Sequence, residues 1–304
     1  MSVLLATHNR AESLGRLLEV LHRQRVPPDL AWEVLVVQSA CTDETARTTD
    51  AWRARLPLAL LVEAAPGKCR ALNRALDRAR GELLVFTDDD VIPADDWLVT
   101  LVDAAARWPA HDIFAGAVVP RYPAGTPALF TCSPYAGVAF AHFVPEPTEG
   151  PSSRTPFGPN MAIRRSRIAG HRFRADLGPN GENYPIGGET EFLRRLVAAG
   201  AQIVHVPTAA VEHVVRPDQL CQRYLLTRAR NFGRGLARLS PAAPSAPRLF
   251  GAPRYLWREL AGAHLRWFWS SLSPADPATR LRARWQLEIV RGTLQEARLG
   301  TRRP

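Results

Sequence analysis

The first 120 residues alternate between short apolar runs and longer segments with helical spacing. The apolar runs, which predict buried parallel strands, lie at 3–6, 32–37, 58–62, 83–87 and 113–119. The segments between them predict helices at 11–24, 43–55, 68–80 and 95–108. This repetition predicts an α/β fold with a doubly wound, mostly parallel sheet and helices on both faces. Such sheets bind ligands beyond the carboxyl ends of their strands.

The second half of the chain has a looser pattern. Residues 122–145 contain no charged side chain but four prolines, which a membrane-spanning helix could not accommodate, so we expect a partly buried irregular segment. The pattern then predicts a helix at 189–199, a strand at 202–206 and a basic helix at 217–239. A proline-rich linker precedes two final helices, a C-terminal helical appendage at 254–272 and 277–298.

Composition places the chain among ordinary globular proteins. Its 304 residues are 46% hydrophobic and 22% charged, which excludes a disordered or fibrous chain. The four cysteines are far apart, so neither a structural zinc site nor a disulfide framework is expected. The N-terminus lacks the features of a secretory signal. A cytoplasmic protein is expected.

The positive charge is concentrated at the C-terminal end. Residues 1–213 contain 22 basic and 24 acidic side chains, whereas residues 214–304 contain 17 arginines and 5 acids. A basic domain of this kind suits an anionic membrane surface, a phosphorylated ligand or nucleic acid, or else forms a solvated helix face. No motif of basic and aromatic residues typical of nucleic-acid binding accompanies it, so nucleic acid is not an expected partner.

Three adjacent carboxylates follow the fourth predicted strand, at Asp88, Asp89 and Asp90. Their mutual repulsion is most simply offset by a divalent cation. The side chains of Asp88 and Asp90 leave the strand on the same side, so both can converge on one ligand. The alternative is a solvated acidic turn that caps the next helix. Because the cluster lies where a doubly wound sheet binds ligands, a binding role is favoured.

The chain resembles family 2 glycosyltransferases of the GT-A fold. The resemblance covers roughly residues 1–235 and rests on an ordered set of motifs: VLLATHNR, VLVVQSACTD, GKCRALN, GELLVFTDDD, FGPNMAIRR and GGETEF. It implies a catalytic domain over 1–235, with a nucleotide-binding half at 1–120 and an acceptor half at 121–235. A linker at 236–253 and basic helices at 254–304 follow.

The resemblance also implies nucleotide-binding residues at the strand ends and on the third helix, namely Thr7, Arg10, Gln38, Lys68, Asn73 and Asp88. For the first strand the alternative is a helix N-terminus capped by Thr7 or Asn9. Gln38 stands where relatives carry a base-binding carboxylate, and it presents a donor as well as acceptors. Arg70 and Lys68 near a helix N-terminus suit a phosphate, or else simply point into solvent.

For the metal, the resemblance implies Asp90 and, further along the chain, His213 as ligands of Mg²⁺ or Mn²⁺. A lone histidine after a strand can equally be a packed core residue. Asp89 is expected to be structural.

For catalysis, the resemblance points to Glu189 as general base, in the place of the aspartate that relatives carry. Shifted by one residue, the same motif leaves Thr190 where the base should be. A helix-capping glutamate is a further interpretation.

Together these features predict an inverting glycosyltransferase that uses a nucleotide-diphosphate sugar, with UDP favoured on family frequency, and a hydroxyl acceptor on a glycan, a lipid-linked sugar or a small molecule. The alternatives are a metal-dependent nucleotidyltransferase and a catalytically silent binding scaffold. The nucleotidyltransferase is disfavoured because the loop after the first strand contains no glycine.

The last helices place aromatic residues beside arginines, as in the segment LRWFW at 265–269. This composition is typical of an element that lies in a membrane interface and is too charged to span it. We therefore expect peripheral association with an anionic membrane, on the inner face of the cell membrane. The alternative is a helical hairpin that packs Trp267 and Trp269 on the core.

Overall fold

The structure is a computed structural model that describes residues 1–131, 135–144, 146–181, 184–272 and 276–300. Within these residues the chain forms two compact units. The first contains Met1–Arg121, Ala141–Ala175 and Gly188–Val214, and the second contains Tyr122–Phe140, Asp176–Gly187 and Val215–Pro304. The units differ from the boundaries expected at 235 and 253, because parts of the expected acceptor half pack with the C-terminal helices.

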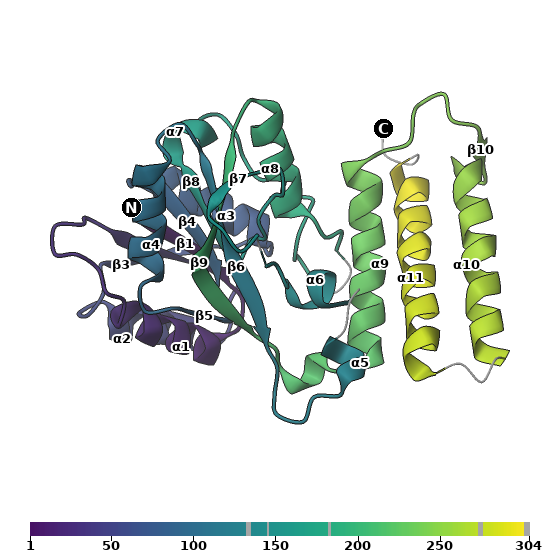
Figure 1. Ribbon diagram of the computed structural model, residues 1–304, viewed down its shortest axis with the longest axis horizontal. Coiled ribbons are helices and arrows are strands. Elements are labelled where there is room, and N and C mark those ends of the chain that lie inside the picture. Colours follow the sequence, from purple (N-terminus) through teal and green to yellow (C-terminus); the bar gives the residue numbers. More distant parts are fainter. Residues whose placement is uncertain (132–134, 145, 182–183, 273–275, 301–304) are drawn as a thin grey trace. The chain divides into compact units, whose positions relative to one another are not determined.

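The described part of the first unit contains one nine-stranded sheet (Figure 1). The strand order is β3-β2-β1-β4-β8-β6-β9-β5, and β7 also pairs with β9. The strands are β1 Ser2–Thr7, β2 Glu33–Ser39, β3 Leu58–Glu63, β4 Leu83–Asp88, β5 Val91–Pro93, β6 Ile113–Arg121, β7 Gly150–Ser152, β8 Asn160–Arg164 and β9 Ile203–Val214. β1 is parallel to both β2 and β4, and β2 is parallel to β3. β8 lies between β4 and β6 and runs antiparallel to both.

The helices of this unit follow the strand–helix alternation of the sequence. They are α1 Ala11–His22, α2 Thr45–Trp52, α3 Lys68–Arg78, α4 Trp97–Arg107, α7 Arg165–Ile168 and α8 Gly188–Ala198. The leucine stripe of α1 at positions 14, 17, 18 and 21 is fully buried, as a helix with apolar residues on one face requires. The doubly wound α/β architecture expected from the sequence is confirmed.

The sequence pattern missed the shorter strands. β5, β7 and β8 contain three to five residues each, too few for a periodic signal. The strand expected at 202–206 continues as β9 beyond Pro207 to Val214. Its last part includes the polar residues Glu212 and His213, which interrupt the apolar run by which a strand is recognised. The pairing of β9 with β6 shifts register between Gly116 and Ala117.

The second unit is mainly helical. Its elements are α5 Ala128–Thr131, α6 Tyr135–Phe140, the short helix η1 Pro217–Gln219, α9 Gln222–Leu239, the hairpin β10 Arg248–Leu249 and β11 Ala252–Pro253, α10 Arg254–Leu272 and α11 Pro277–Gly300. Tyr135 and Phe140, from the expected irregular segment, are buried with Trp285 of α11. Cys132, Pro134 and Pro145 of that segment lie outside the described residues.

Helix α11 lies between α9 and α10 (Figure 1) and approaches α9 very closely. A Cβ atom at Gly233 of α9 would come 1.9 Å from the carbonyl oxygen of Ile289, and one at Gly292 of α11 would come 2.0 Å from that of Arg230. Both positions therefore require glycine for the two backbones to meet. Buried ion pairs join the same helices, with Arg234 donating to Glu296 at 2.9 Å.

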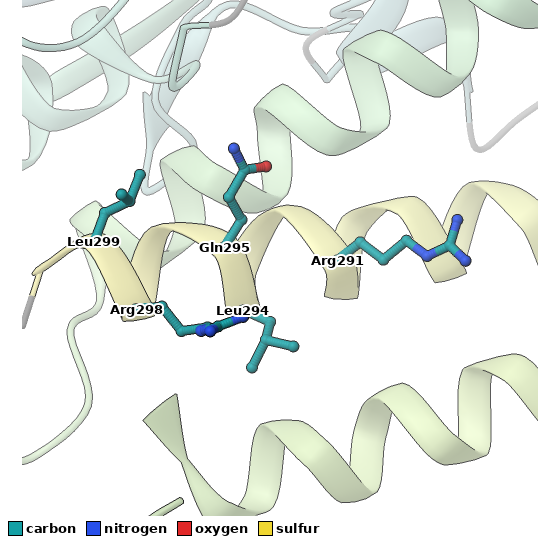
Figure 2. A pocket seen from close by; sticks show the side chains of 5 residues that line it. All are labelled: Arg291, Leu294, Gln295, Arg298 and Leu299. Carbon is teal, nitrogen blue, oxygen red and sulfur yellow. The ribbon is translucent and has the colours of Figure 1, made fainter. Parts of the chain in front are cut away.

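The outer parts of this helical unit are open to solvent. A hollow of about 380 Å³ follows the C-terminal part of α11, and Figure 2 shows its lining side chains: Arg291, Leu294, Gln295, Arg298 and Leu299. Throughout the described ranges, no helix is both long and apolar enough to cross a bilayer.

Candidate active site

The carboxyl ends of β1, β2 and β4 bring polar residues to one edge of the sheet. Thr7 is in register with Gln38, and Ala6 is in register with Asp88. After Asp88 the chain turns through Asp89 and Asp90 into β5, which runs antiparallel to β9. In this pairing Val91 lies opposite His213. Residues from distant parts of the sequence therefore meet at the predicted ligand-binding edge.

Asp89 anchors this edge from within. Its carboxylate accepts a hydrogen bond of 2.6 Å from the Thr7 hydroxyl and one of 2.9 Å from the Arg10 guanidinium, and the residue is only 4% exposed. Burial raises the pKa of Asp89 to about 6, against the lowering effect of Arg10. With both oxygens bonded to protein groups, Asp89 serves to fix the turn, in line with its expected structural part.

Asp90 joins the same arginine to the histidine of β9. Arg10 donates to Asp90 Oδ2 at 2.7 Å, while His213 Nε2 lies 3.4 Å from Asp90 Oδ1. Burial acts to raise the pKa of Asp90, but His213, Arg10 and Lys68 outweigh it and hold the pKa below its usual range. The structure thus brings together the two residues expected as metal ligands.

Lys68, the only lysine of the sequence, bridges two carboxylates. Its Nζ lies 2.5 Å from Asp88 Oδ1 and 2.7 Å from Glu189 Oε1. Lys68 is the first residue of α3, and Glu189 lies in the first turn of α8. Burial alone would lower the pKa of Lys68, but the two carboxylates outweigh it and raise the pKa above its ordinary value. The ammonium therefore stays charged.

The strand-end cluster formed by these groups has an excess of negative charge. It comprises the cations Arg10 and Lys68 and the carboxylates Asp88, Asp89, Asp90 and Glu189. The four carboxylates exceed the two cations by two negative charges, which a divalent cation would balance. In the part of the chain that the structure describes, however, no group of three or more His, Cys, Asp or Glu side chains is arranged to hold a metal. Within these residues, Asp90 and His213 are the two predicted ligands, and they lie beside each other.

Gly158 makes room for the Glu189 side chain. A Cβ atom at position 158 would come within 2.5 Å of Glu189 Oε1 and 2.9 Å of its Cδ. The next polar residue, Asn160, is fully buried and bonds the carbonyl oxygens of Ala117 and Ala209, where β6 and β9 change register. Gly158 of the FGPN motif therefore leaves the space that the Glu189 side chain occupies, a contact that the sequence alone did not reveal.

The other predicted nucleotide-binding residues are placed differently. Gln38 is partly exposed at the end of β2, next to Thr7 in the sheet. The amide of Asn73 exchanges two hydrogen bonds with the backbone of Phe173, at 2.9 and 2.8 Å. Arg70 is exposed on α3. The structure therefore shows Asn73 hydrogen-bonded to the backbone of Phe173. Gln38 lies at the carboxyl end of β2, at the predicted ligand-binding edge of the sheet.

The start of α1 is stabilised by a residue outside its own segment. The backbone N–H of Ala11 donates to Asp43 at 2.9 Å, while the Asn9 side chain accepts from the backbone N–H of Thr42 at 2.7 Å. Since the Thr7 hydroxyl bonds Asp89, neither Thr7 nor Asn9 caps this helix. Thr7 and Arg10 instead belong to the strand-end cluster.

The model of a protein family described as "Glycosyl transferase family 2" matches residues 2–167, more than half of the sequence. The chain belongs to glycosyl transferase family 2. The matched residues include Thr7, Arg10, Lys68 and all three aspartates, whereas Glu189 and His213 lie beyond them.

Two curated relatives illustrate the range of the similarity. Glycosyltransferase AglE of Haloferax volcanii is 23% identical over 220 residues, which are 71% of this chain and 67% of the relative. The poly(ribitol-phosphate) beta-N-acetylglucosaminyltransferase TarS of Staphylococcus aureus is 36% identical over 115 residues. That alignment covers 36% of this chain and only 19% of TarS.

Two solved structures share the fold of this chain. The mannosyltransferase PcManGT of Pyrobaculum calidifontis, in complex with GDP-Man and Mn²⁺, superposes with a TM-score of 0.64 at 21% identity, covering 97% of this chain and 86% of that one. TarS residues 1–349 in complex with UDP-GlcNAc give a TM-score of 0.55 at 18% identity, covering 98% and 91%. The expected GT-A-like fold is confirmed.

Proposed function

We propose that the chain is an inverting glycosyltransferase that moves a sugar from a nucleotide-diphosphate sugar to a hydroxyl acceptor. The observation that carries the proposal is the strand-end cluster, in which the carboxylates of β4 and the start of α8 share a single lysine. Relatives of the same fold are described with UDP-GlcNAc or GDP-Man, which supports a nucleotide-sugar donor. We favour UDP, with an acceptor on a glycan, a lipid-linked sugar or a small molecule.

Donor binding falls to the residues at the strand ends. Thr7 and Arg10 stabilise the turn at Asp89 through their hydrogen bonds to its carboxylate. In this proposal Asp88 faces the ribose of the donor, and the Gln38 amide hydrogen-bonds the edge of its base. Lys68 lies at the N-terminus of α3, where the helix dipole and the ammonium together attract a diphosphate. Asn73, on the same helix, supports this site through its hydrogen bonds to the backbone of Phe173.

A divalent cation fits the chemistry of the remaining groups. Asp90 and His213 present a carboxylate oxygen and an imidazole nitrogen to each other, a donor set compatible with Mn²⁺ or Mg²⁺. When bound, such an ion would neutralise charge on the departing diphosphate. Arg10 donates a hydrogen bond to Asp90 Oδ2, and Asp90 Oδ1 is the oxygen that lies next to His213.

Glu189 is the general base of this proposal, and Lys68 restrains it in the free protein. A carboxylate paired with an ammonium at 2.7 Å accepts a proton poorly. The donor diphosphate competes for the same ammonium, so donor binding would release Glu189 to deprotonate the acceptor hydroxyl. The attack then proceeds in line on the anomeric carbon and inverts its configuration. This order couples base activation to donor binding.

Glu191 is a poor rival for the same task. Arg195, four residues later on α8, holds both of its carboxylate oxygens at 2.8 and 3.0 Å. This pair lies along the helix surface and is typical of a structural contact. The comparison favours Glu189, whose carboxylate pairs with Lys68, the candidate phosphate ligand.

The test is turnover of nucleotide sugars by the Glu189→Gln variant. With Mn²⁺ and UDP-sugars or GDP-sugars, the parent should slowly release the nucleoside diphosphate, because water can replace the acceptor. We expect Glu189→Gln to reduce this rate by about a hundredfold to ten-thousandfold, as loss of a positioned base does, with donor binding retained. Glu191→Gln is the matched control and should remain within a few fold of the parent.

Other outcomes would redirect the assignment. A parent that binds donor without any turnover would be a silent scaffold, and release of pyrophosphate from nucleoside triphosphates would indicate a nucleotidyltransferase. Equal turnover by Glu189→Gln and the parent would refute Glu189 as the base.

A further inference from the structure

The C-terminal half of α10 exposes a stripe of large apolar side chains. Leu265, Phe268, Trp269 and Leu272 are 58%, 51%, 65% and 63% exposed. Their i, i+3, i+4, i+7 spacing places them on one face of the helix, which we call the outer face of α10. The residues that α10 buries are Leu256 and Ala263, and Ala263 lies about half a turn around the helix from Leu265. The stripe therefore faces away from the packed side.

The surroundings of the outer face are basic. α10 carries exposed arginines at 254, 258 and 266, and the first turns of α11 add exposed arginines at 280, 282 and 284. Glu259 and Asp276 are the acidic residues between 254 and 284. The two helices lie side by side and are connected at the end that carries the stripe (Figure 1). Arg266, Arg280, Arg282 and Arg284 thus share one end of this helix pair with the stripe, whereas Arg254 and Arg258 lie toward the other end of α10.

We propose that the outer face of α10 lies in the interfacial layer of an anionic membrane. Trp, Phe and Leu gain by leaving water at the level of the lipid headgroups, while flanking arginines reach the phosphates with their guanidinium groups. The helix is not apolar enough to cross the bilayer, so it would lie along the surface. Trp269 is 65% exposed and is not packed on the core, whereas Trp267, four residues after the buried Ala263, lies on the packed side and is 37% exposed.

A second copy of the chain is the competing occupant, and charge disfavours it. A twofold interface places the same surface on both partners, so the arginines around one stripe would face those around the other. Like charges so placed oppose association, whereas anionic headgroups complement them. The basic rim therefore selects lipid over self-association.

The experiment is flotation of the full chain with vesicles of phosphatidylcholine alone and of phosphatidylcholine with phosphatidylglycerol in equal parts. We expect binding to the anionic vesicles that weakens as salt is raised. Replacing Phe268, Trp269 and Leu272 together by serine should reduce partitioning at least about tenfold. Replacing Arg266, Arg282 and Arg284 by glutamine should reduce it by about fivefold per residue on anionic vesicles.

The matched control is Phe250→Ser, an aromatic residue 73% exposed in the β10–β11 hairpin, at the other end of α10. It should leave partitioning unchanged. No binding to anionic vesicles, or equal losses in the control and the stripe variant, would overturn the proposal. A dimer in light scattering that the stripe variant dissolves would assign the outer face to a second copy instead.

Discussion

Two buried clusters of charged side chains in this chain differ in their charge balance. The helix cluster of the second unit consists of four arginines and three carboxylates, namely Arg230, Arg234, Arg238, Arg291, Asp176, Glu288 and Glu296. The strand-end cluster of the first unit contains two cations and four carboxylates. In the helix cluster Arg238 is shared between Asp176 and Glu296, whereas Arg230 and Arg291 both pair with Glu288. In the strand-end cluster both cations are shared between two carboxylates.

We infer that the first network is structural and that the second belongs to a binding site. The helix cluster connects α9 and α11 where glycines let the backbones touch, and its cations exceed its carboxylates by one. In the strand-end cluster the carboxylates exceed the cations by two, and the cluster lies where a doubly wound sheet binds ligands. Ion pairing occurs in both. The sign of the excess charge and the place at the strand ends are what favour a cation-binding site.

The largest effect should come from breaking the helix cluster. Glu296→Gln removes a buried carboxylate that both Arg234 and Arg238 contact, and we expect a loss of about 3 kcal/mol in the free energy of unfolding. Asp88→Asn in the strand-end cluster should change that free energy by less than about 1 kcal/mol, because it relieves repulsion while Lys68 keeps Glu189. Urea denaturation of both variants measures the contrast. Equal losses would mean that both networks are structural.

A smaller effect should follow from crowding the base. In Gly158→Ala the new methyl group displaces the Glu189 carboxylate, and we expect turnover to fall about tenfold with donor binding and thermal stability nearly unchanged. Kinetics with donor and Mn²⁺ measure this. In a Glu189→Gln background the same substitution should have no further effect, since the two changes act on one group. Additive losses would place the effect of Gly158 elsewhere.

The sequence predicts the parallel core of the fold well and its remainder poorly. β1, β2 and β4 are apolar runs buried on both faces, and such runs carry a strong signal. β8 has only five residues, and the last part of β9 includes the polar residues Glu212 and His213. The hydrophobic pattern of neither segment can be told apart from that of a loop. The discontinuous units also escape prediction, because they depend on contacts between distant segments.

The candidate site shows the same limit. Its position could be inferred because Asp88 to Asp90 follow a buried strand, and ligands bind at such strand ends. The bridge from Lys68 to Glu189 joins residues 121 positions apart in the numbering, and no local pattern encodes it. The space that Gly158 leaves for Glu189 is likewise a tertiary contact. Residue types at the site are therefore predictable, and their pairings are not.

Calorimetric titration tests most directly whether the strand-end cluster binds a nucleotide through a metal. UDP and GDP are titrated into the parent and into the Asp90→Asn variant, with Mn²⁺ and with the metal removed by a chelator. The parent should bind one of the nucleotides at least about tenfold more tightly with Mn²⁺, by analogy with the cost of disturbing a metal site. Asp90→Asn should lose this difference, and Asp89→Asn should keep most of it. Binding by Asp90→Asn that still tightens with Mn²⁺ as much as the parent's would contradict the account.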